Sequence, residues 1–137
     1  MVHVPERVRR AVEQRAAGRC EYCHAPQVIL GYRLHVEHII PRARGGANGL
    51  ENLALSCSTC NFAKGSLIDA PDPAGGAHAA LFNPRVHAWA DHFAWASDGA
   101  TLVGTTTIGR ATVVALNMNQ PLQLAARPLW RELGLLS

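Results

Sequence analysis

Four cysteines in two pairs constrain this chain more than any other feature of its sequence. They are Cys20 and Cys23, then Cys57 and Cys60, and each pair has the spacing Cys-x-x-Cys. Four soft thiolates suit a tetrahedral Zn2+ ion that is closed to solvent. One ion shared by both pairs would close a loop of 33 intervening residues and fix its shape. The cysteines therefore predict a structural zinc site, with an iron–sulfur cluster or a redox dithiol as the alternatives.

The size and composition of the chain agree with a small domain held by a metal. Its 137 residues are 48% hydrophobic and 17% charged, which excludes a disordered or fibrous protein. No run approaches 18 consecutive apolar residues, and the N-terminus lacks the apolar core of a signal peptide. We therefore expect a cytoplasmic protein without a membrane partner. The cytoplasm is reducing, so the thiols are free to bind metal.

Positive charge is concentrated in the half of the chain that holds the cysteines. Residues 1–66 carry a net charge of +4 and residues 67–137 a net charge of −1. A basic surface on that half favours a polyanionic partner such as nucleic acid. An ordinary solvated basic face explains the same charge equally well.

Local patterns predict an α+β fold around a compact ββα finger. The expected finger elements are a strand at 32–40, ended by Pro41, a Gly-rich loop at 42–49, a strand at 53–55, and a helix from Cys60 to about Ser66 capped by Ser58 or Thr59. An amphipathic helix at about 5–17 precedes it, and its arginines could lie against phosphates or simply face solvent.

Three segments are expected along the chain. The first, 1–67, holds the N-terminal helix and the finger, and the second, 68–80, is rich in Pro and Gly and is expected to be a linker or loop. The third, 81–137, is expected to be a mixed, mainly helical extension that packs on the finger. Its predicted elements are an apolar segment at 101–106, a helix at 108–117, and a last helix from Pro121 that Pro128 kinks or splits.

A second group of side chains carries oxygen and nitrogen atoms suited to hydrolysis. His38 can act as a base near neutral pH. Glu37 and Asn61 offer hard oxygen ligands, which favour Mg2+ or Mn2+ over zinc. A regular strand puts Glu37 and His38 on opposite faces, so both reach one site only if the strand bends or frays there.

These residues together resemble a known family. The stretch from His35 to Gly46, HVEHIIPRARGG, followed by Asn52-Leu and by Cys57-x2-Cys60-Asn61-x2-Lys64-Gly65, resembles the HNH endonuclease finger of the ββα-metal type with a four-cysteine zinc site. The resemblance covers residues 20–66. More loosely, the tract around Leu81–Arg85, Trp89 and His92-Phe93 resembles small stand-alone bacterial proteins of this family.

The resemblance implies a role for each matching residue. Glu37 would be the acidic metal ligand, His38 the general base and Asn61 the second metal ligand. Asn52 would orient the His38 segment by hydrogen bonds across the finger. Asn48 competes for this role, but Asn48-Gly49 suits a turn, so Asn52 is preferred. The family motif has a histidine at its third position, where this chain has Asn61. This difference favours Mg2+ or Mn2+ as the working ion.

Four further residues are candidates for nucleic-acid contacts. Lys64 is expected at a phosphate, since it lies one turn after Asn61 on the same helix face. Arg42 and Arg44 flank a glycine turn and could touch the backbone, with solvated loop arginines as the alternative. His35 could also reach a phosphate, although a half-exposed strand histidine is the preferred interpretation. His24 is expected to be a surface histidine, and the tryptophans are expected in the core.

The resulting hypothesis is a metal-dependent endonuclease that hydrolyses phosphodiester bonds of DNA, with structural Zn2+ and catalytic Mg2+ or Mn2+. A zinc ribbon that binds nucleic acid without cutting it is the main alternative, and a zinc-stapled protein-interaction domain is a third. The sequence leaves open whether the protein is a monomer or a homodimer.

Overall fold

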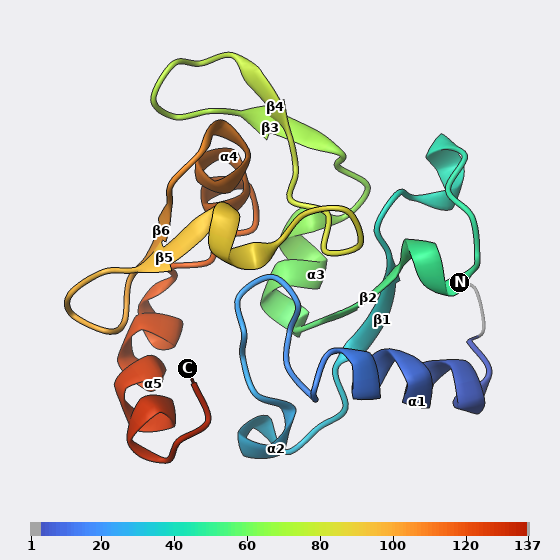
Figure 1. The fold of residues 1–137 in the computed structure, drawn as a ribbon, viewed down its shortest axis with the longest axis horizontal. Coiled ribbons are helices and arrows are strands. Elements are labelled where there is room, and N and C mark those ends of the chain that lie inside the picture. Colours follow the sequence, from blue (N-terminus) through green and yellow to red (C-terminus); the bar gives the residue numbers. More distant parts are fainter. Residues whose placement is uncertain (1–3, 137) are drawn as a thin grey trace.

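The computed structural model describes residues 4–136 and confirms a mixed α+β fold. Helices and three two-stranded antiparallel sheets alternate along the chain, with the finger on one side and the C-terminal half on the other (Figure 1). The helices are α1 Glu6–Arg15, α2 Gln27–Leu30, α3 Ser58–Lys64, α4 Thr107–Ala115 and α5 Pro121–Glu132. The strands are β1 His35–His38, β2 Leu53–Ser56, β3 Asp69–Pro71, β4 His78–Ala80, β5 Phe93–Trp95 and β6 Leu102–Gly104. No helix among these residues is long and apolar enough to cross a bilayer.

The finger is built from β1, β2 and α3. Glu37 pairs with Ala54 and His38 with Leu53 in the antiparallel ladder, and every residue of β2 is buried. β1 is shorter than the expected strand because the chain turns directly after His38. Helix α3 begins at Ser58, two residues earlier than expected, because Cys57 is its N-cap and accepts a hydrogen bond from the Cys60 amide. Ser58 and Thr59 are therefore inside the helix, and neither caps it.

The loop between β1 and β2 folds back so tightly that it requires glycine at position 46. A Cβ atom there would lie 1.7 Å from the Ile40 carbonyl oxygen and 2.8 Å from the Asn52 side-chain nitrogen. No residue with a side chain fits such a contact without moving the backbone. Gly46 thus brings the loop against the end of β1, next to His38.

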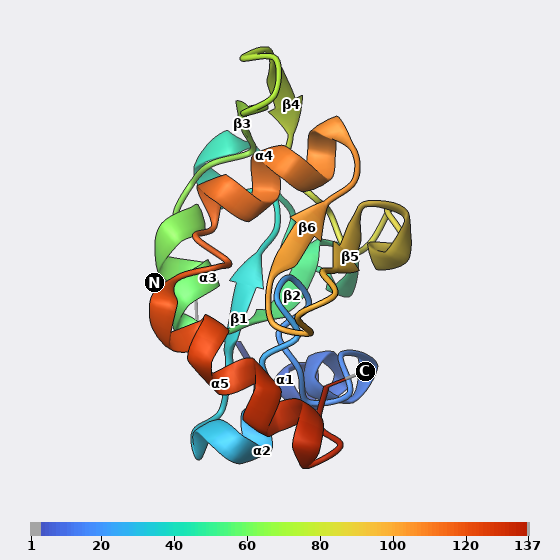
Figure 2. The ribbon, with the colours of Figure 1, turned by 90° about the vertical axis from the view of Figure 1, so that its left-hand side faces the viewer.

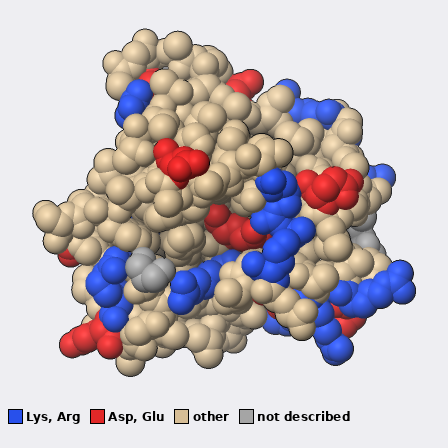
Figure 3. Space-filling model, viewed as in Figure 1, with Lys and Arg blue, Asp and Glu red and all other residues tan. Residues whose placement is uncertain are grey.

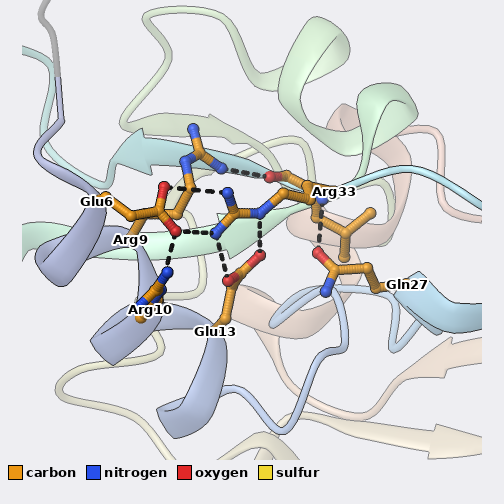
Figure 4. Close-up of polar contacts among 7 residues, drawn as sticks. Glu6, Arg9, Arg10, Glu13, Gln27 and Arg33 are labelled. Atoms are coloured by element: carbon orange, nitrogen blue, oxygen red, sulfur yellow. Dashed lines mark hydrogen bonds and ion pairs between the residues drawn. The ribbon is translucent and has the colours of Figure 1, made fainter.

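Arginines attach α1 to the finger. Arg9 donates to the Leu34 carbonyl at 2.9 Å, and Arg15 donates to the carbonyls of Leu50 and Leu53 at 2.8 and 2.6 Å. Arg33, two residues before β1, forms ion pairs with Glu6 and Glu13 of α1 (Figure 4). Arg9 and Arg15 therefore hold the protein itself, whereas Arg7 stays exposed and Arg10 pairs with Glu6 on the exposed side of α1. Contact of this face with phosphates stays a prediction.

The segment 68–80 is a hairpin where a linker or loop was expected. β3 and β4 pair through Asp69–Ala80, Ala70–Ala79 and Pro71–His78. Asp72, at the start of the turn, accepts two hydrogen bonds from Arg110 of α4 at 2.9 and 2.8 Å. The Pro and Gly residues thus serve the turn, and Arg110 ties the hairpin to α4.

The C-terminal half contacts the finger through one continuous core. Its buried members come from both halves and include Tyr22, Leu34, Leu53, Leu55, Phe82, Phe93, Leu102, Leu116 and Met118. Trp89 donates to the Tyr22 carbonyl at 2.8 Å, and Trp130 of α5 is 7% exposed. Helix α5 is a single helix in Figure 2, and Pro128 lies inside it, so the proline does not split it.

Candidate metal centre and active site

The four cysteines converge on one point. Their sulfur atoms all lie within 4.8 Å of one another, and the four residues are at most 2% exposed. Cys23 Sγ and Cys57 Sγ are 3.6 Å apart. Four sulfurs at about 2.3 Å from a tetrahedral zinc ion would be roughly 3.8 Å apart, so the cluster fits zinc with little adjustment.

A tight turn attaches the first cysteine pair to β2. The Cys20 amide donates to the Ala25 carbonyl at 3.0 Å, and the His24 amide donates to the Cys20 carbonyl at 2.9 Å. Glu21 joins this turn to Leu55 through its amide and its carboxylate, both at 2.9 Å. The turn therefore presents Cys20 and Cys23 to the cysteines that flank the start of α3.

His24 is packed beside the cluster and is not the surface histidine that was expected. Its ring stacks on the Trp89 ring at 4.0 Å between centroids, and its Nδ1 atom is buried without a hydrogen-bond partner. Burial lowers the pKa of His24 to about 4, so the ring is neutral at pH 7. With four thiolates already present, His24 acts as packing for the turn.

Glu37 lies in the interior of the finger. The Tyr22 hydroxyl donates to its Oε1 atom, and the Lys64 ammonium lies 3.3 Å from its Oε2 atom. Burial raises the pKa of Glu37, and the Lys64 charge and the Tyr22 hydrogen bond oppose that effect. Tyr22 had no predicted role, because no local pattern links it to a residue 15 positions away.

Lys64 is placed differently from the expected phosphate contact. It is 1% exposed, and its ammonium donates to the carbonyls of Ile39 at 2.8 Å and His38 at 3.3 Å. Together with its ion pair to Glu37, these bonds join α3 to the end of β1. Lys64 therefore supports the site from inside the protein.

His38 lies at the end of β1, partly exposed, and its ring is held by Asn48. The distance from His38 Nε2 to Asn48 Oδ1 is 2.9 Å. An amide oxygen only accepts hydrogen bonds, so with Oδ1 facing the ring the donor is Nε2, and the neutral ring then has its lone pair on Nδ1. Asn48, which the sequence favoured only as a turn residue, thus contacts the candidate base directly.

Asn52 crosses the loop that follows β1, as the resemblance implied. Its oxygen accepts from the Ile40 amide at 2.8 Å, and its nitrogen donates to the carbonyls of Ile40 and Ala47 at 2.9 and 2.8 Å. All three bonds are to main-chain atoms, and the residue is 7% exposed. Asn52 therefore fixes the backbone after His38, while Asn48 fixes its ring.

The ladder is regular through Glu37 and His38, so no bulge turns them to one face. Glu37 is buried, while His38 is partly exposed at the strand end. Asn61 is also partly exposed, one turn before Lys64 on α3, and its side chain makes no hydrogen bond to residues 4–136. Its amide oxygen is therefore available to a ligand.

The remaining candidates are on the surface. His35 contacts the Ser58 hydroxyl at 3.1 Å, and Arg44 donates to the Ser66 carbonyl at 3.1 Å. Arg42 is exposed and makes no side-chain bond within the described chain. Cationic and acidic side chains are interspersed on the face drawn in Figure 3, without one continuous basic stripe.

Within residues 4–136, no group of three or more His, Cys, Asp or Glu side chains other than the cysteines is arranged to hold one ion. Any second metal must therefore rely on few protein ligands. Mg2+ binds in this way, since it keeps several waters and needs only one or two carboxylates beside substrate phosphates.

Comparison with known proteins gave one match. Residues 20–67 match the family model described as HNH endonuclease, which covers about a third of the chain. The match begins at the first cysteine and ends three residues after Lys64, so it contains both sites described above. Neither the curated proteins nor the solved structures compared with the chain gave a match.

Proposed function

Residues 20–67 form an HNH endonuclease domain, and from that premise we propose that the protein is a metal-dependent endonuclease that hydrolyses phosphodiester bonds of DNA. The HNH domain by itself indicates a nuclease-type function on nucleic acid. The observation that supports cleavage most directly is the His38 ring, which is partly exposed and held by Asn48 with a lone pair on Nδ1.

His38 acts as the general base in this proposal. Hydrolysis of a phosphodiester requires removal of a proton from the attacking water. Nδ1 of His38 can accept that proton, because the hydrogen bond to Asn48 keeps the other ring hydrogen on Nε2. Asn52 holds the main chain on which the ring is mounted.

In this proposal Glu37 and Asn61 would hold the divalent cation, which requires the end of β1 to bend out of its regular ladder so that Glu37 reaches the site of His38. The Glu37 oxygens each keep a lone pair beyond the bonds to Tyr22 and Lys64, and the Asn61 amide is free of protein partners in the described chain. Hard oxygen donors of this kind fit Mg2+ or Mn2+. When bound, the cation supplies positive charge to the scissile phosphate and to the leaving oxygen.

The test is cleavage of supercoiled plasmid by the purified zinc-loaded protein with Mg2+ or Mn2+. We expect nicked circles, because one copy of the protein has one active site and cuts one strand. The ends at the nick should carry 5′-phosphate and 3′-hydroxyl. His38→Ala should reduce the rate by about 100-fold or more while the zinc content stays unchanged. His78→Ala is the matched control, since His78 is an exposed histidine on β4 outside the matched region. Equal cleavage by His38→Ala and the intact protein would remove His38 from this role.

One observation favours binding without cleavage as a second candidate. The Glu37 carboxylate is 8% exposed and already paired with Lys64, so its charge is compensated without any ion. A nucleic-acid-binding zinc module would need none of Glu37, His38 and Asn61 for chemistry. A salt-dependent mobility shift of DNA with no cleavage in Mg2+, Mn2+, Ni2+ or Co2+ would support this second function.

A further inference from the structure

Two polar residues of α5 are buried, and the first of them contacts the cysteine cluster. Gln123 is 7% exposed and Arg127 is fully buried, one turn further along the same helix. Side chains of this kind are rarely enclosed unless they have strong partners. Gln123 lies 100 residues after Cys23, so no motif in the finger predicts either residue.

Gln123 points its amide nitrogen at two of the four sulfurs. Nε2 lies 4.0 Å from Cys23 Sγ and 4.0 Å from Cys57 Sγ, at the long end of the range for a sulfur acceptor. The amide oxygen accepts a hydrogen bond from Arg127 Nη2 at 3.0 Å. A guanidinium has only donors, so the oxygen must face Arg127 and the amide hydrogens must face the sulfurs.

Arg127 brings a positive charge that has no carboxylate partner among the described residues. Its other hydrogen bonds go to neutral oxygens, namely the carbonyls of Ala100 and Met118 and the side chain of Asn119. Burial lowers the pKa of Arg127, and the four cysteines are the groups that oppose this effect. Zn2+ bound to four thiolates has a net charge of −2, which gives a buried guanidinium the counter-charge that it lacks.

We propose that Gln123 and Arg127 are the outer layer of the zinc site, in which α5 supplies an N–H···S hydrogen bond and a buried positive charge to the zinc–tetrathiolate. The C-terminal residues 81–137 are then part of the metal centre. Binding of zinc and docking of α5 stabilise each other, because the anionic cluster and the buried cation compensate each other's desolvation. The proposal concerns retention of zinc and does not depend on whether the protein cuts DNA.

Arg131 provides a matched control for Arg127. It is on the same helix one turn later, donates to the Gly99 carbonyl at 3.0 Å, and its guanidinium lies 5.3 Å from the Trp95 ring centroid. The corresponding distance from Arg127 to that ring is 5.4 Å. The two arginines thus share a helix and a ring contact, and only Arg127 reaches Gln123.

The experiment measures zinc and its surroundings in the full chain. Release of zinc to a chromophoric chelator is followed for the intact protein, Gln123→Met, Arg127→Met and Arg131→Met. Each protein is also loaded with Co2+, and the thiolate-to-cobalt charge-transfer band is recorded. This band reports on hydrogen bonds to sulfur, which a role in packing alone would not change.

We expect Gln123→Met to release zinc about 10-fold faster, since residues that hydrogen-bond to metal ligands typically contribute 10- to 100-fold to metal affinity. The charge-transfer band of this variant should move to longer wavelength. Arg127→Met should release zinc at least as fast, and Arg131→Met should match the intact protein. A Gln123→Met protein with the zinc release rate and cobalt band of the intact chain would overturn the proposal, even if Arg127→Met fails to fold. Plasmid cleavage is not a readout here, so failure of this proposal and failure of the proposed nuclease function remain distinguishable.

Discussion

The sulfur site and the histidine site of this protein share one helix and differ in how they are enclosed. The sulfurs are buried under the Cys20–Ala25 turn, β2, α3 and α5. His38 and Asn61 are partly exposed, whereas Glu37, directly before His38, is buried. A closed tetrahedral site suits a structural ion, whereas a polymer substrate requires reacting groups at the surface.

The histidine site depends on the sulfur site, but the sulfur site does not depend on the histidine site. Cys60 and Asn61 are adjacent on α3, and Lys64 one turn later holds Glu37 and the main chain after it. Loss of zinc would release α3 and therefore the histidine site. Loss of Glu37 or His38 would leave the cysteines and α5 in place. Four predictions test this asymmetry.

The largest effect is expected from removal of one zinc ligand. Cys60→Ser should lower the free energy of unfolding by more than about 5 kcal/mol, because structural zinc contributes about 10–16 kcal/mol in small zinc domains. Zinc content and thermal unfolding measure this effect. Ser58→Ala, on the first turn of the same helix, is the control, and a Cys60→Ser protein that keeps its zinc and its stability would refute a structural site.

Lys64→Met should be the next most damaging change, because it leaves the buried Glu37 carboxylate without a cation. We expect a loss of about 3–5 kcal/mol in urea unfolding of the zinc-loaded protein without added Mg2+. Adding Glu37→Gln should restore part of that loss, since the uncompensated charge is then absent. The exposed Arg42→Met should change stability by no more than about 0.5 kcal/mol.

A surface role for Lys64 would give a different result. In that case Lys64→Met would have the stability of Arg42→Met, and Glu37→Gln would restore nothing. That outcome would contradict the burial of Lys64 and would return it to the phosphate contact that the sequence suggested.

The two asparagines separate positioning of the backbone from positioning of the ring. Asn52→Ala removes three partly buried bonds to the main chain and should cost about 2–4 kcal/mol of stability. Asn48→Ala removes one exposed contact to His38, so it should leave the melting temperature nearly unchanged and slow cleavage by about 10- to 100-fold. Equal activity of Asn48→Ala and the intact protein would show that the ring contact is not needed.

The smallest effect is expected at the exposed pairs of Arg33 with Glu6 and Glu13. Hydrogen bonds from Arg33 lower the pKa of both carboxyl groups below 4.5. Their stabilising contribution is therefore present above pH 4.5 and is lost as the pH falls through the lowered values. Arg33→Met should reduce the melting temperature at pH 7 by only a few degrees, on the order expected for surface ion pairs. The difference should disappear in acid and at high salt.

Local spacing was sufficient to predict the cluster of four cysteines and the order of the finger elements. Two Cys-x-x-Cys pairs leave little choice of partner, and Pro41 and the glycines after it stop β1 close to the expected place. The segment 68–80 was missed as a hairpin, because its Pro and Gly residues look the same in a linker and in a turn. What decides between them is Arg110, which binds Asp72 from 38 residues away.

The sequence by itself determined the two Cys-x-x-Cys pairs and the finger whose residues 20–67 match the HNH endonuclease family model, since residue type and spacing are local properties. Only the tertiary structure decided the surroundings of each group. It buried Lys64 against Glu37, placed Asn48 on the His38 ring, and brought Gln123 to the sulfurs with Arg127 bound to it. Contacts of this kind depend on how separate elements pack, and burial then sets the charge that each group needs beside it.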